Sequence, residues 1–116
     1  MAKWYTLNDY PQPVIAVGSV FRLPAAYPYE SVVDFLVFNP READYGLGLM
    51  VSSGYKAGLT LVILPLASQG TWSQGIDKAW LIANWSTWVY PPCTVDKVWL
   101  CPQTRTPRLP RKIGQN

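Results

Sequence analysis

The pattern of apolar positions predicts a chain built mainly of β-strands. Apolar runs rich in β-branched and aromatic residues recur between segments marked by glycine, proline or charged residues. These runs predict strands at residues 19–23, 31–39, 47–53 and 59–65. The last two are almost continuously apolar, which favours central strands over a half-solvated edge strand. The alternating segment "TVDKVWLC", residues 94–101, predicts a final strand with Val95, Lys97 and Trp99 on one side.

One helix is predicted within "IDKAWLIANWSTWVY", residues 76–90. Asp77 is a good N-cap because its carboxylate can accept a hydrogen bond from an early backbone N–H group, and two prolines end the helix. Helical spacing places side chains on two adjoining faces, one with Trp80, Asn84 and Trp88 and the other with Leu81, Trp85 and Trp88. With three tryptophans in nine residues, at least one is expected to have an exposed edge.

The predicted fold class is α+β, with a bent antiparallel sheet or partly open barrel of about five strands and one main helix packed on it. The length of 116 residues fits one domain, which we expect over residues 1–102. The opening, residues 1–13, is polar and aromatic and is expected to form an arm or an edge segment. Residues 103–116 form a separate tail, basic and interrupted by prolines.

The stretch "SSGYKAGLTLVILP", residues 52–65, places a lysine between two glycines and raises the question of a phosphate-binding loop. A Walker-type loop needs four residues between its glycines, a Ser or Thr after the Lys, and a helix that follows. Here three residues separate Gly54 from Gly58, Ala57 follows the lysine, and an apolar strand comes next. A β-hairpin therefore fits better, with Tyr55 and Lys56 exposed near its tip.

The charge distribution disfavours nucleic acid as a partner. The formal net charge is +3, but four of the ten basic residues lie in the last dozen positions, which leaves six basic against seven acidic residues in the body. Nucleic-acid-binding domains usually carry a basic face on their folded part. The chain also lacks an apolar run long enough for a signal peptide or a membrane span, so a cytoplasmic protein without membrane contact is expected.

No catalytic, metal or cofactor site is predicted. The sequence has no histidine, which excludes triads that use one, and two cysteines alone make a poor zinc site. Cys93 and Cys101 are expected to be reduced and structural. Glu30 and Asp34 are expected to be two solvated carboxylates rather than the catalytic pair of a glycosidase. Ser52 and Ser53 precede a glycine, but no strand-to-helix turn follows them, so neither is expected to be a nucleophile.

Three segments resemble the bacterial immunity protein 45 family of polymorphic toxin systems: "YPYESVVDF", "SGYKAG" and "NWSTWVYPPC". With the spacing between them, the likeness extends from about residue 18 to residue 100. It does not cover the opening or the basic tail. The resemblance implies a small cytoplasmic protein, made beside a toxin, which it binds and neutralises without catalysis.

Two functions from different classes remain open at this point. One is a toxin-neutralising protein whose partner is a toxin domain encoded nearby. The other is a small barrel-like module that binds nucleic acid through exposed aromatics and the basic tail. Exposed aromatics and a few charges on rigid elements are typical of interfaces, and the expected partner-binding residues are Tyr27, Tyr29, Glu30, Tyr55, Lys56 and Trp85. The oligomeric state and the toxin's activity are not indicated by any residue.

Removal of residues 103–116 is expected to leave stability nearly unchanged. The tail has too little apolar content and too many prolines for a packed element. The thermal midpoint of the shortened protein should match that of the full chain by circular dichroism. A large decrease would show that the tail packs on the body.

Overall fold

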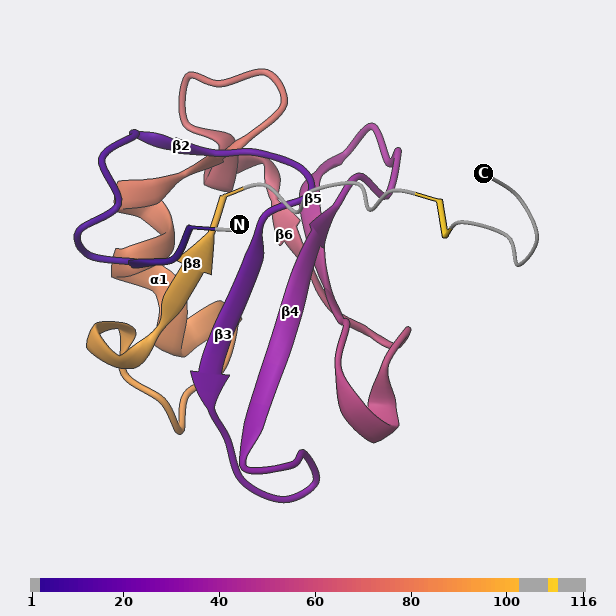
Figure 1. Ribbon diagram of the computed structural model, residues 1–116. Helices are drawn as coiled ribbons and strands as arrows, with labels where there is room; N and C mark the ends of the chain where they lie inside the picture. Colours follow the sequence, from indigo (N-terminus) through magenta and orange to yellow (C-terminus); the bar gives the residue numbers. More distant parts are fainter. Residues whose placement is uncertain (1–2, 103–108, 111–116) are drawn as a thin grey trace.

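The computed structural model describes residues 3–102 and 109–110, and its centre is a six-stranded antiparallel sheet (Figure 1). The strand order is β1-β8-β3-β4-β5-β6. Their bounds are β1 Tyr5–Thr6, β8 Trp99–Cys101, β3 Val20–Pro24, β4 Val32–Phe38, β5 Tyr45–Val51 and β6 Thr60–Pro65. A second, two-stranded sheet pairs β2 (Val14–Ile15) with β7 (Ile76–Asp77). The other elements are the helix α1 (Lys78–Trp88) and three 3-10 turns, η1 (Gly54–Lys56), η2 (Leu66–Gln69) and η3 (Val95–Lys97).

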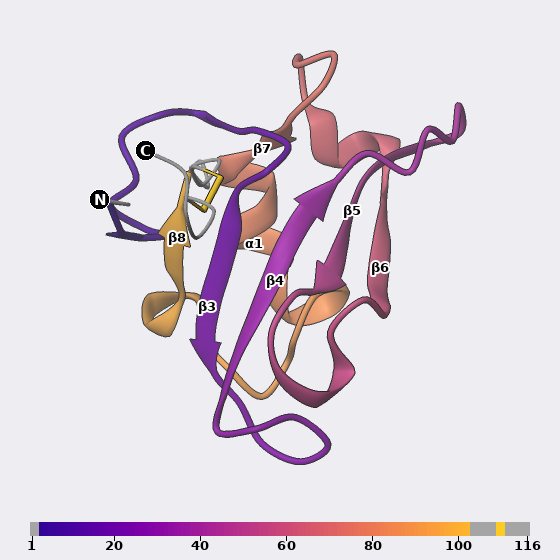
Figure 2. The same cartoon turned by 45° about the vertical axis from the view of Figure 1, so that its right-hand side comes forward.

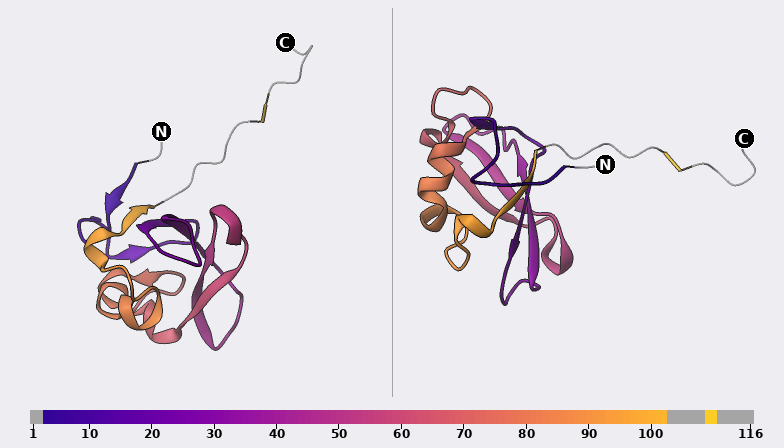
Figure 3. Two further views of the ribbon diagram at one scale, coloured as in Figure 1. Left: turned by 90° about the horizontal axis from the view of Figure 1, so that it is seen from below. Right: turned by 60° about the vertical axis from the view of Figure 1, so that its left-hand side comes forward.

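The core lies between one face of the sheet and α1, which crosses behind β3 and β4 in Figure 2. Alternate residues of β3 and β4 are buried, because successive side chains of a strand point to opposite faces. The pairs Phe21–Phe35 and Leu23–Val33 lie directly opposite each other and are at most 1% exposed. Seen from below, the sheet bends with α1 on its concave side (Figure 3).

The helix begins as the sequence predicts. The Asp77 carboxylate accepts a hydrogen bond from the backbone N–H of Trp80 at 3.2 Å, which satisfies one of the early helix donors. The rings of Trp80 and Trp88 lie 6.2 Å apart, as expected for side chains on one face. Trp88 is 37% exposed and provides the expected exposed tryptophan edge. The Asn84 side chain is half-buried and donates to the Trp80 carbonyl.

Trp85, one of the expected partner-binding residues, does not lie at the surface. Trp85 is completely buried, and its ring packs edge-on against Phe21 at 5.8 Å between centroids. Its indole N–H has no hydrogen-bond partner in the described part of the chain, so packing holds the ring in place. Trp85 lies on the same side of the helix as the buried Leu81 and faces the sheet.

The sheet has one strand more than predicted, and of the two predicted forms it is the open bent sheet rather than the partly open barrel. It has six strands rather than about five, because the two-residue β1 adds an edge that is too short to leave a pattern in the sequence. Its edges, β1 and β6, do not pair with each other, so the sheet is not a closed barrel. The prediction that residues 59–65 form a central strand is wrong. The apolar run is continuous because both faces of β6 are partly buried. It does not indicate that a strand pairs with β6 on each side.

The final predicted strand is shorter than expected. Residues 95–97 form η3, and only Trp99–Cys101 pair with β3 and β1. The strand ends beside buried Ser19, whose hydroxyl donates to the carbonyl oxygen of Pro102 at 2.8 Å. The predicted basic tail lies outside the described residues, apart from positions 109–110.

Replacing Trp85 with Ala should lower the free energy of unfolding by about 3–5 kcal/mol, because it empties a fully buried aromatic site. The matched control is Trp88→Ala on the same helix, where the ring is 37% exposed and the loss should be about 1 kcal/mol. Chemical denaturation measures both. Equal losses for the two variants would contradict the placement of Trp85 in the core.

Candidate partner-binding surface

Three segments that are distant in the sequence meet at one end of the sheet, at the bottom in Figure 1. They are the end of β3 with the β3–β4 loop at residues 24–31, the β5–β6 hairpin tip at residues 52–59, and the segment after α1 at residues 90–97. We call these residues the loop end. Antiparallel pairing dictates this meeting, because β3 finishes where β4 begins, and β5 finishes beside the start of β4. The three segments contain much of the sequence that resembles the immunity family.

Three aromatic rings join the segment after α1 to the β3–β4 loop. Tyr90 lies 5.9 Å from Tyr29 and 6.3 Å from Phe35, and Tyr29 lies 6.1 Å from Phe35, all in edge-on arrangements. Such pairs stabilise beyond the area they bury, by about 0.5–1.5 kcal/mol each. The Tyr90 hydroxyl also accepts a hydrogen bond from the backbone N–H of Ala26 at 3.0 Å. The β3–β4 loop is therefore held to the segment that follows the helix.

A carboxylate joins the same loop to the hairpin tip. Glu30 accepts a hydrogen bond from the backbone N–H of Tyr55 at 3.0 Å. The carboxylate also approaches Gly54 so closely that a Cβ atom there would collide with it. Gly54 has a φ of +68°, a conformation that other residues rarely adopt. The positive φ of the turn and the close approach of Glu30 therefore both require a glycine at position 54, one of the two glycines around Lys56.

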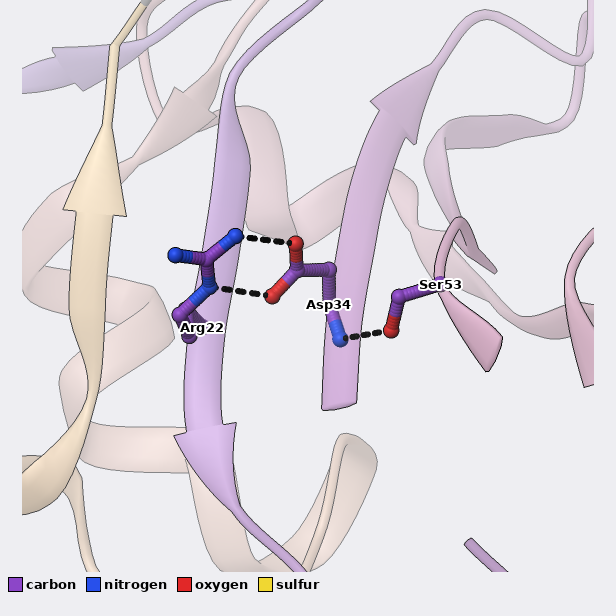
Figure 4. A network of polar contacts seen from close by, with 3 residues as sticks. All are labelled: Arg22, Asp34 and Ser53. Atoms are coloured by element: carbon purple, nitrogen blue, oxygen red, sulfur yellow. Dashed lines mark hydrogen bonds and ion pairs between the residues drawn. The ribbon is translucent and has the colours of Figure 1, made fainter. Parts of the chain in front are cut away.

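Ser53 provides a second contact that holds the hairpin tip, this time to β4 (Figure 4). Its hydroxyl accepts from the backbone N–H of Asp34 at 2.9 Å, and Ser52 donates its N–H to the Asp34 carbonyl at 2.9 Å. The Asp34 carboxylate accepts two hydrogen bonds from Arg22, at 2.8 and 2.9 Å. This bonding raises the pKa of Arg22 above its already high ordinary value. The Ser-Ser pair therefore has a structural role in this hairpin.

The tyrosines at the two tips are strongly exposed. Tyr27 is 96% exposed and Tyr55 is 89% exposed, as the hairpin prediction requires for Tyr55. Glu30 is exposed too, and Tyr29 is half-buried. The prediction that Lys56 is exposed is wrong, because its side chain is half-buried. Five of the six predicted partner-binding residues thus lie at the loop end, and the buried Trp85 does not join them at the surface. The sequence analysis missed Tyr90, although the Tyr-Pro-Pro segment that ends the helix marks it as a fixed position.

The loop end contains one thiol, that of Cys93. Cys93 is a buried thiol, and burial raises its pKa, so it is protonated and a poor nucleophile at neutral pH. Within residues 3–102 and 109–110, no group of three acidic or cysteine side chains is placed to hold a metal ion. None of the helices in that part of the chain is long and apolar enough to cross a membrane.

The chain belongs to the immunity protein 45 family, since the model of that family, described as Immunity protein 45, matches residues 7–100. This confirms the resemblance drawn from the three segments. The match also includes residues 7–13 of the opening, which the resemblance had left aside. Searches of curated proteins and of solved structures gave no match.

Substituting Glu30 with Ala should free the hairpin tip from the β3–β4 loop. We expect the amide hydrogen of Tyr55 to exchange with solvent about tenfold faster, because its charged acceptor is lost. Hydrogen exchange followed by NMR measures the rate. The amide of Val51, which donates to the Leu59 carbonyl within the same hairpin, serves as the internal control and should keep its rate. An unchanged rate for Tyr55 would contradict the Glu30 contact.

Proposed function

We propose that this member of the immunity protein 45 family binds a cognate bacterial toxin domain with its loop end and neutralises it without catalysis. One observation carries the proposal: two nearly fully exposed tyrosines, Tyr27 and Tyr55, stand on loops that Tyr90 and Glu30 fasten together. Family membership supplies the toxin as the class of partner. The loop end supplies the surface.

The arrangement has the properties of a protein interface. Tyrosine is enriched among the residues that dominate binding, because it brings a large apolar area and a polar tip with few rotatable bonds. Loops that are already fixed lose little conformational entropy on binding, so more of the contact energy appears as affinity. The contacts of Glu30, Ser53 and Tyr90 fix the loop end in this way.

The toxin is expected to be encoded beside this chain, and the complex to form in the cytoplasm of the producing cell. The near-neutral body gives no reason to infer a nuclease as the target, since inhibitors that mimic nucleic acid are strongly acidic. Inhibition by simple occlusion of the toxin requires only shape and charge complementarity. No residue of the loop end needs to act as an acid, a base or a nucleophile.

The double variant Tyr55→Ala/Lys56→Ala should fold normally and lose protection against the toxin encoded by the adjacent gene. Both side chains lie on the hairpin tip, and Tyr55 makes little contact with the body. The expected thermal midpoint is that of the wild type, with binding to the toxin domain at least tenfold weaker. Protection is measured as growth of cells that express the toxin, and binding by calorimetry.

The matched control is Arg41→Ala/Tyr45→Ala, which removes an exposed cation and a half-exposed tyrosine at the opposite end of the sheet. This variant should protect as the wild type does. A tip variant that is both stable and fully protective would refute the binding assignment. Tight binding of single-stranded nucleic acid, with no complex with the toxin, would favour the alternative function.

A further inference from the structure

A small cavity opens at the loop end, between the end of β3 and the segment after α1. Its volume is about 260 Å³. Pro24, Ala25 and Ala26 form one wall, and the other is formed by Tyr90, Pro92, Cys93, Thr94 and Lys97. The hydrogen bond from the Ala26 N–H to the Tyr90 hydroxyl bridges the two walls. The cavity is smaller than the roughly 300–1,000 Å³ of pockets that bind small molecules, and its size therefore suits one side chain of a protein partner.

The charge of the residues that line the cavity indicates which kind of partner side chain it could receive. Lys97 is the one lining residue that carries a full charge at neutral pH, since Cys93 is a buried thiol and the others are uncharged. Lys97 is exposed, and it forms no ion pair with any residue that the structure describes. Its neighbour Asp96 is not among the lining residues, and its carboxylate accepts a hydrogen bond from the Thr94 hydroxyl. A carboxylate entering the cavity would meet this ammonium group.

The cavity is continuous with the surface assigned to the toxin. Tyr90 lines it and also packs against Tyr29, the residue that lies between exposed Tyr27 and Glu30 in the β3–β4 loop. A partner covering Tyr27 would thus lie directly beside the cavity mouth. Because Lys97 is exposed, the cavity would lie at the rim of the covered surface.

We propose that this cavity receives a single Asp or Glu side chain of the toxin, with Lys97 as its ionic partner. The proposal rests on the proposed function and adds to it the chemistry of the recognised residue. A charge at the rim of an interface acts on the association rate and on the salt dependence of binding. Lys97 would therefore select the cognate toxin from related toxins that lack the acidic side chain.

The test measures binding of the toxin domain encoded by the adjacent gene to variants of the full chain by surface plasmon resonance. Lys97→Glu should weaken binding at least tenfold at low salt, mainly through slower association, whereas Lys97→Arg should stay close to the wild type. The control Lys3→Glu makes the same change in net charge on an exposed lysine near the opposite end of the β1–β8 pair, and should change binding less than twofold. Thermal midpoints confirm that each variant is folded.

Two further measurements locate the acidic group. Ala26→Phe, which fills the mouth of the cavity without changing charge, should also weaken binding about tenfold. A single Asp or Glu to Lys substitution in the toxin should restore binding to Lys97→Glu. Wild-type affinity of Lys97→Glu or of Ala26→Phe, or the absence of any restoring substitution, would overturn the proposal while leaving the proposed function standing. Failure of the wild type to bind the toxin would overturn both.

Discussion

The arrangement of this protein's exposed surface depends on Tyr90. Its ring contacts Tyr29 and Phe35, and its hydroxyl accepts the backbone N–H of Ala26, so one side chain after the helix holds the β3–β4 loop against the core. That loop in turn presents Glu30 to the backbone of Tyr55, which holds the hairpin tip. The ring contacts of Tyr90 and the hydrogen bonds of Tyr90 and Glu30 therefore hold in place the loops that carry the two exposed tyrosines.

The residues that stabilise the fold are thus different from the residues proposed to bind the toxin. The inward face of the sheet and Trp85 form the core, whereas Tyr27 and Tyr55 contribute little buried area of their own. A protein that neutralises its partner by binding needs such a division, because its exposed contact residues can then vary without loss of the fold. The proposed pocket for an acidic side chain beside Lys97 would add a charge-selective contact to a surface otherwise dominated by tyrosine.

Much of the fold could be predicted from the sequence, because β3, β4, β5, β6 and the Asp77-capped helix each leave a local signal. The two-residue β1 lies in the opening that was predicted only as an arm or an edge segment, and η3 was missed. The exposure of Tyr55 was predictable from the glycines of its hairpin. The burial of Trp85 was not, because the helix carries tryptophans on several sides and only the tertiary packing decides which one faces the sheet. Contacts such as Glu30–Tyr55 join residues 25 positions apart and depend on strand register.

Hydrogen exchange of the protein with and without the toxin domain, followed by mass spectrometry, tests the central claim most directly. Recognition through the loop end predicts slower exchange on complex formation in residues 24–31, 52–59 and 90–97. It predicts unchanged exchange in residues 39–44, which connect β4 and β5 at the opposite end of the sheet. Protection confined to residues 39–44, with the three loop-end segments unaffected, would contradict the account.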